Sequence, residues 1–113
     1  MHSKRQLQVS GLIQKELAGL FTHKFNGLIP GRLVSISGVN MSSDLSIAKV
    51  YLSIFPSTNG SEIIKEINNN HSKIRYELGR IIKNDMKRIP ELTFYLDDSL
   101  DQIERIDNAL KKS

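Results

Sequence analysis

The apolar positions near the start of the chain recur with the period of an α-helix, from about residue 4 to residue 22. Residues spaced by three, four or seven positions lie on one side of a helix, so that side is predicted to be buried. Its members are Val9, Ile13, Leu17, Leu20 and Phe21. Ser3 and Gln6 have the spacing of a capping box, in which the two side chains satisfy backbone N–H groups at the helix start.

Two strands are predicted next, at residues 32–40 and 45–55, joined by a loop of hairpin length. The first is rich in β-branched residues, and Gly38 indicates a bulge or a close backbone approach. The second alternates, with Ala48, Val50, Leu52 and Ile54 on one face and Lys49, Tyr51 and Ser53 on the other. Pro56 ends it.

Two helices are then predicted, the first capped by Ser61 and the second running from about Ser72 to Lys87 or Arg88. The run of three asparagines at residues 68–70 separates them, because Asn side chains compete with the helix for backbone hydrogen bonds. The second helix ends before Pro90, since the residue that precedes a proline avoids the helical region.

Residues 92–96 alternate as a third strand, and Ser99 with Gln102 forms a second capping-box spacing that opens a last helix. Its inward positions are Leu100, Ile103, Ile106 and Leu110. The predicted order is helix, strand, strand, helix, helix, strand and a short C-terminal helix. This order favours an α+β fold in which helices cover one face of a three-stranded sheet.

The length and composition fit one globular domain, residues 1–113, in a reducing compartment. The chain contains no cysteine, which excludes disulfides, thiolate metal sites and a cysteine nucleophile. No stretch approaches 18 apolar residues, and the first residues lack the apolar core of a secretory signal. A cytoplasmic protein without a membrane partner is therefore expected.

Candidate catalytic and metal-binding residues are scarce. His2, His23 and His71 are isolated from one another and lack metal-ligand spacing. The acids Asp97, Asp98 and Asp101 do not have the spacing of an EF-hand, and they suit a helix start. No phosphate-binding glycine loop or serine-nucleophile motif occurs. We expect no metal, no cofactor, no small-molecule substrate and no enzymatic activity.

Charge is unevenly distributed along this basic chain, whose net charge is +4. Residues 71–90 contain six Lys or Arg and two acids. A basic sector of this kind is typical of a protein that binds a polyanion such as nucleic acid. The plainer alternative is a solvated helix face whose charges serve solubility.

On a helical projection of this segment, a row of cations lies opposite the apolar side. Phosphates along a nucleic-acid backbone suit such a row, because neutralising them releases counterions without reading sequence. The row consists of Lys73, Arg80, Lys83 and Lys87. Arg75 and Arg88 lie near the apolar edges, while Lys4 and Arg5 extend the row only if folding brings them near.

Two other side chains of this helix leave alternatives open. Tyr76 lies within the row and is interpreted as a half-buried aromatic, with stacking on an unpaired base as the alternative. Asp85 falls inside the apolar side, so either the helix is distorted there or Asp85 finds a hydrogen-bond donor. The predicted apolar side comprises Ile74, Leu78, Ile81, Ile82, Met86 and Ile89.

Two long motifs resemble the ribosome-binding factor A family. The pattern V-x-M-S-x-D-L-x-x-A-K-V-Y runs from Val39 to Tyr51, and P-E-L-T-F-x-x-D-x-S-L runs from Pro90 to Leu100. The resemblance implies a KH-like fold of the second type. It also implies a non-catalytic cytoplasmic factor that binds the small-subunit rRNA of immature ribosomal subunits, assists processing of the rRNA 5′ end and supports growth in the cold. We expect the chain to be a monomer.

One departure from the family pattern concerns the kink between the two middle helices. The family has an A-x-G sequence there, in place of the G-x-x-G loop of other KH domains, and this chain has neither. Alignment on the helix that follows places residues 70–72 at the kink, whereas counting back from Pro90 places residues 72–74 there.

Two other function classes remain open from the sequence. A protein–protein module would use the same basic helix against an acidic partner protein, and binding without any affinity for rRNA would favour it. A nuclease would need a metal or a His–carboxylate pair, and RNA cleavage on addition of a divalent cation would indicate one.

Overall fold

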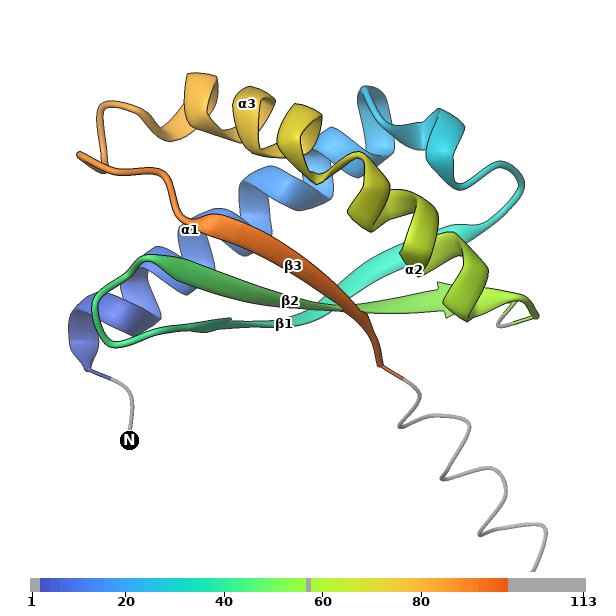
Figure 1. Ribbon diagram of the computed structural model, residues 1–113, viewed down its shortest axis with the longest axis horizontal. Coiled ribbons are helices and arrows are strands. Elements are labelled where there is room, and N and C mark those ends of the chain that lie inside the picture. The colour runs from blue at the N-terminus through green and yellow to red at the C-terminus, as the bar shows by residue number, and fades with distance from the viewer. Residues whose placement is uncertain (1–2, 57, 98–113) are drawn as a thin grey trace, which may run out of the picture.

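In the described residues, helices lie over one face of a three-stranded sheet and leave the other face uncovered (Figure 1). The computed structural model describes residues 3–56 and 58–97. Its helices are α1 (Lys4–His23), the short 3-10 helix η1 (Asn26–Leu28), α2 (Gly60–Asn69) and α3 (His71–Ile82). Its strands are β1 (Leu33–Met41), β2 (Ile47–Phe55) and β3 (Glu91–Leu96). The predicted C-terminal helix lies outside the described residues.

Helix α1 begins as the sequence predicted. The Ser3 hydroxyl accepts the Gln6 N–H at 3.1 Å, and the Gln6 side chain accepts the Ser3 N–H at 2.7 Å, which confirms the capping box. The amide nitrogen of the buried Gln6 also donates to the Met41 carbonyl at 3.1 Å. One side chain therefore both starts α1 and ties it to the end of β1.

The strand order is β1-β2-β3, with β1 antiparallel to β2 and β2 parallel to β3. The parallel pairing is possible because α2 and α3 return the chain across the sheet. The predicted inward residues of β2 are buried, namely Ala48, Val50, Leu52 and Ile54. The β1–β2 register shifts between Ile36 and Gly38, which confirms the irregularity predicted there. The core is therefore formed between this face and the helices.

No helix of the described residues covers the outer face of the sheet. Lys49 is exposed there, and the rings of Tyr51 and Tyr95 stack with centroids 5.5 Å apart. Leu33 and Phe55, which are opposite each other in the β1–β2 ladder, are also exposed. Outward residues therefore alternate with buried residues along β2, as expected for a sheet that the described helices cover on one face.

The asparagine run separates α2 from α3, as predicted, and the break lies at Asn70. This agrees with the placement of the kink at residues 70–72. The predicted cap of α2 is wrong by two positions, because Asn59 occupies the cap position and Ser61 lies inside the helix. Asn59 has a φ of 60°, a left-handed conformation that Asn adopts more readily than most residues.

Candidate nucleic-acid interface

The basic segment after residue 71 is only partly helical. Helix α3 ends at Ile82, so the prediction that it continues to Lys87 or Arg88 is wrong. The N–H groups of Asp85 and Met86 both donate to the Ile82 carbonyl, at 2.9 and 3.2 Å, and the chain turns there. Met86 is buried from this turn, which explains why its spacing imitated a longer helix.

Three side chains of this segment lie differently from their predicted places. Ile81 was expected on the apolar side of the helix but is 45% exposed. Tyr76 was interpreted as half-buried, yet it is 66% exposed on α3. Asp85 lies exposed on the turn. Because the helix has already ended, the carboxylate of Asp85 does not enter the core, and no helix distortion is required.

Four of the predicted cations meet around one hollow beyond the end of α3. The hollow has a volume of about 530 Å³ and lies between the start of α1, the β1–β2 loop and the segment after α3. We call it the basic hollow; its cations are Arg5, Lys83, Lys87 and Arg88. The Arg5 Nη2 donates to the Asp85 carbonyl oxygen at 3.2 Å and so joins α1 to this segment.

The basic hollow carries an excess of positive charge. Asp44 and Asp85 line it beside the four cations. Within the described part of the chain, none of the four forms an ion pair with a carboxylate. Cations without a carboxylate partner attract mobile counterions, which a bound phosphate backbone would release.

The charge of Asp44 is fixed by the loop between β1 and β2. Hydrogen bonds from the Ser46 hydroxyl, the Ser42 hydroxyl and the Ser46 N–H lower the pKa of Asp44 to about 2. The carboxylate is therefore ionised throughout the physiological range. Its oxygen accepts from both hydroxyls, so the S-x-D motif closes the loop beside the basic hollow rather than adding a free ligand.

The remaining predicted cations of the segment are separated from the basic hollow. Arg80 pairs with Glu77, whose other carboxylate oxygen accepts Lys24 at 2.9 Å. Lys73 lines a smaller hollow near the start of α3. Lys4 is exposed on the first turn of α1 but does not line the basic hollow. The single row expected from the projection is therefore divided between two places.

Arg75 is held by the protein itself. Its Nε and Nη2 donate to the carbonyl oxygens of Pro90 and Ile89, at 3.1 and 2.7 Å, and Nη2 lies 3.7 Å from the carboxylate of Glu91. The guanidinium fork thus fixes the segment that leads into β3. This arrangement gives Arg75 a structural role in the described conformation.

We expect Arg75→Lys to lower the free energy of unfolding by about 1–2 kcal/mol, because an ammonium group cannot reproduce both fork contacts. Denaturant unfolding measures the change. Arg80→Lys is the matched control on the same helix, and a change below about 0.5 kcal/mol is expected there because Arg80 is exposed. Equal losses in the two variants would contradict the structural role of Arg75.

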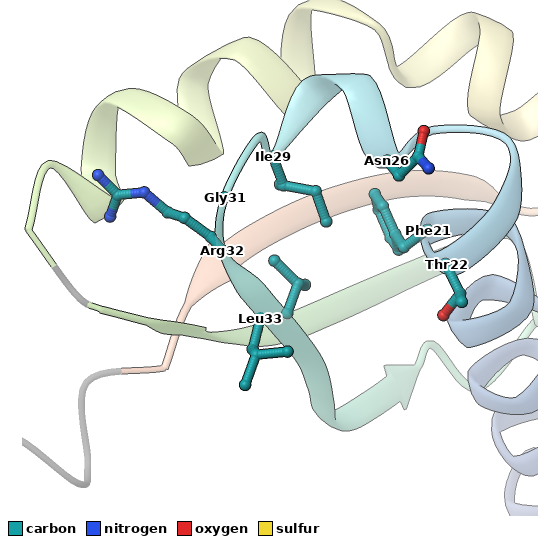
Figure 2. A pocket seen from close by; sticks show the side chains of 8 residues that line it. Phe21, Thr22, Asn26, Ile29, Gly31, Arg32 and Leu33 are labelled. Atoms are coloured by element: carbon teal, nitrogen blue, oxygen red, sulfur yellow. The ribbon is translucent and has the colours of Figure 1, made fainter.

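A third hollow, of about 460 Å³, lies where α1 approaches the start of β1 (Figure 2). Its walls include Phe21, Ile29 and Leu33. Figure 2 shows the Arg32 side chain extending away from the apolar side chains. Its Nη1 donates to the carbonyl oxygens of Pro56 and Thr58. The cation of this hollow is therefore engaged by a neighbouring loop.

Metal-binding clusters and membrane-spanning helices are both absent from the described residues. Within residues 3–56 and 58–97, no three His, Asp or Glu side chains gather in a way that would hold a metal ion. Nor does this part of the chain include a helix with the length and apolar character needed to cross a membrane.

The sequence reasoning missed how the turn after α3 brings Arg5 to the same place as Lys83, Lys87 and Arg88. The Asn84–Asp85 pair is the available signal, because both residues favour turns over helix interiors. It also missed Lys24, which reaches Glu77 from the end of α1. That contact joins residues 53 positions apart, and no local pattern indicates it.

Comparison with known proteins agrees with the resemblance seen in the motifs. The sequence profile named ribosome-binding factor A matches residues 5–110. Ribosome-binding factor A of Christiangramia forsetii is 42% identical over 110 residues, which cover 96% of this chain and 84% of that protein. The protein of the same name from Flavobacterium psychrophilum is 40% identical over 112 residues, covering 97% and 85%.

Solved structures show the same fold. The crystal structure of ribosome-binding factor A from Thermus thermophilus matches with a TM-score of 0.63 at 22% identity, over 80% of this chain and 94% of that one. A homology model of the Thermus thermophilus protein, fitted into the cryo-EM map of its complex with the 30S subunit, also gives 0.63, at 20% identity, over 79% and 91%. The predicted KH-like fold of the second type is confirmed.

Proposed function

This chain belongs to the ribosome-binding factor A family, and from that premise we propose that it binds the immature small ribosomal subunit through precursor small-subunit rRNA. It acts as a non-catalytic assembly factor that assists late maturation and processing of the rRNA 5′ end. Binding energy alone performs this role, since a ligand that prefers one rRNA conformation raises the population of that conformation.

The basic hollow is the observation that supports an rRNA partner. Four cations from two separate parts of the chain converge beside this cavity, namely Arg5, Lys83, Lys87 and Arg88. In this proposal these cations contact phosphates of the rRNA backbone. Contacts of this kind position a protein on RNA but do not read its sequence.

The other cations predicted to bind RNA lie outside the basic hollow and contribute less to the proposed interface. Lys73 and Arg80 are exposed on α3 and extend the surface away from the basic hollow, and Lys4 extends it along α1. Arg75 is excluded from the phosphate contacts, because its guanidinium is held by backbone carbonyls. The interface is thus centred on the turn after α3.

We further propose that the protein works in the cytoplasm as a monomer, with one KH-like domain formed by residues 1–113, and that it serves cold adaptation. The absence of cysteine from the sequence is compatible with a reducing compartment. Sedimentation of the full chain at micromolar concentration tests the monomer, and growth of a deletion strain at low temperature tests the role in the cold.

Ultraviolet crosslinking to immature small subunits tests the rRNA contact. We expect crosslinked peptides from residues 83–88 and from the start of α1, because these segments surround the basic hollow. Crosslinks confined to ribosomal proteins, together with no affinity for isolated rRNA, would instead indicate a module that binds an acidic partner protein.

A further inference from the structure

A hollow of about 350 Å³ lies beside the first turns of α3, separate from the basic hollow. Ser72, Lys73 and Tyr76 share the face of α3 that borders it, since residues three and four positions apart are neighbours on a helix. Lys24 and Phe25 close it from the end of α1, and Glu77 completes its lining. We call it the Tyr76 hollow.

An ion pair joins the two helices that border the Tyr76 hollow. The N–H groups of Lys24 and Phe25 donate to the Leu20 carbonyl at 2.9 and 2.8 Å, which anchors the end of α1. The Lys24 ammonium then lies 2.9 Å from the Glu77 carboxylate on α3. Phe25 is partly buried and packs against the core. The end of α1 and the first turns of α3 are therefore already in place, and a ligand would have to order only exposed side chains such as Tyr76 and Lys73.

The lining of this hollow suits a ligand with a flat, apolar ring and an anionic group attached close to that ring. Most of the surface that lines it is apolar, so aromatic rings and lysine stems form its walls. Tyr76 is 66% exposed, which leaves its ring available for stacking. Within the described residues Lys73 forms no ion pair, so its ammonium group is free to meet a phosphate.

We propose that the Tyr76 hollow binds one unpaired nucleobase, stacked on Tyr76, while Lys73 contacts an adjacent phosphate. This inference rests on the proposed function, because it assigns a base site on the same RNA-binding protein. The volume is at the lower end of the range for ligand pockets and is enough for a single base. A stacked base contributes affinity with little sequence preference, since every base has an aromatic face.

The position of the hollow lets it work together with the phosphate contacts. Lys73 lies in the first turn of α3, and Lys83 follows the last residue of that helix. At 1.5 Å of rise per residue the two positions are separated by about 15 Å along the helix. A few nucleotides span that length. In this proposal phosphates are neutralised at one end of α3 and a base is stacked at the other end.

The test compares binding of the full chain to a short unstructured oligoadenylate, in which one adenine is replaced by 2-aminopurine, with binding to an RNA duplex of the same length. We expect Tyr76→Leu to weaken oligoadenylate binding by about 5- to 150-fold and to leave duplex binding unchanged. Tyr76→Phe keeps an aromatic ring and should retain affinity within about two-fold and preserve the fluorescence change on stacking.

Tyr95→Leu is the control, since Tyr95 is a partly exposed tyrosine on the outer face of the sheet. It should bind both probes as the parent does. The parent could bind oligoadenylate with an affinity that falls as salt rises, while Tyr76→Leu binds it equally tightly. In that case the base site is wrong and the proposed function stands. Tyr76→Leu could instead lose affinity for small subunits and keep its affinity for oligoadenylate. That result would indicate that the hollow receives a side chain of a ribosomal protein, and it also overturns the base site. A parent that binds neither RNA nor subunits overturns both proposals.

Discussion

The triple variant Lys83→Gln, Lys87→Gln and Arg88→Gln is expected to bind rRNA about 100-fold more weakly than the parent at roughly 0.1 M salt. Each neutralised phosphate contributes about 0.9 to the slope of log affinity against log salt on a duplex and about 0.7 on a single strand. With Arg5 included, the parent slope should be near −3 to −4, and the variant should lose about 2 to 3 of it. Filter binding or fluorescence anisotropy over a salt series measures both quantities.

A matched control separates the place of the charges from their number. Lys15→Gln, Lys49→Gln and Lys65→Gln also remove three exposed cations, from α1, β2 and α2. Both triple variants lower the formal net charge from +4 to +1. The control should lose only a small part of the slope. If the two variants weaken binding equally, the attraction belongs to the whole protein and the basic hollow has no special role.

Arg5 is left unchanged in this design because its guanidinium also supports the fold. Its Nη2 donates to the carbonyl of Asp85. Removing it would combine a lost phosphate contact with a loosened segment after α3. Lys83, Lys87 and Arg88 are exposed and, among the described residues, make no side-chain hydrogen bond or ion pair. Their replacement should therefore leave the free energy of unfolding within about 0.5 kcal/mol of the parent.

The fold was predictable because its signals are local. The buried face of α1 repeats with a helical period, and its capping box is complete within Ser3 to Gln6. Strand β2 alternates without interruption, and its inward side chains are those that the alternation selects. The hairpin-length loop between β1 and β2 is also a local signal, and the two strands pair as neighbours. The parallel pairing of β2 with β3 depends on how distant segments meet, and the sequence indicated it only through the family resemblance.

The site was less predictable because it depends on where a helix stops. An apolar period continued past Ile82 through Met86, so the projection placed Lys83 and Lys87 on a helix that does not exist there. Burial of Met86 from a turn satisfies the same period. The convergence of Arg5 with this turn joins residues 80 positions apart. The sequence therefore shows which side chains of this segment are positively charged, but it does not show where folding places them.

Asn68 illustrates a residue whose role only the structure shows. From the sequence it interrupts a helix. In the structure its side-chain amide donates to the Phe94 carbonyl and accepts the Phe94 N–H, both at 2.9 Å. Phe94 lies in β3, which pairs with β2 on one side only in the described sheet. The amide therefore substitutes for a neighbouring strand and covers backbone groups that an edge would expose.

We expect Asn68→Ala to lower the free energy of unfolding by about 2–4 kcal/mol, because two partly buried backbone groups of Phe94 lose their partners at once. Urea unfolding measures the loss. Asn69→Ala removes an exposed asparagine of the same helix turn, and it should change stability by less than about 0.5 kcal/mol.

Asn68→Asp separates the two hydrogen bonds. An aspartate still accepts the Phe94 N–H but places a carboxylate oxygen against the Phe94 carbonyl, where two acceptors repel each other. Stability should therefore fall as pH rises through the carboxyl pKa, since a protonated carboxyl donates to that carbonyl and an ionised one does not. A pH-independent loss in Asn68→Asp, or a loss in Asn69→Ala as large as in Asn68→Ala, would mean that the edge of β3 does not depend on this amide.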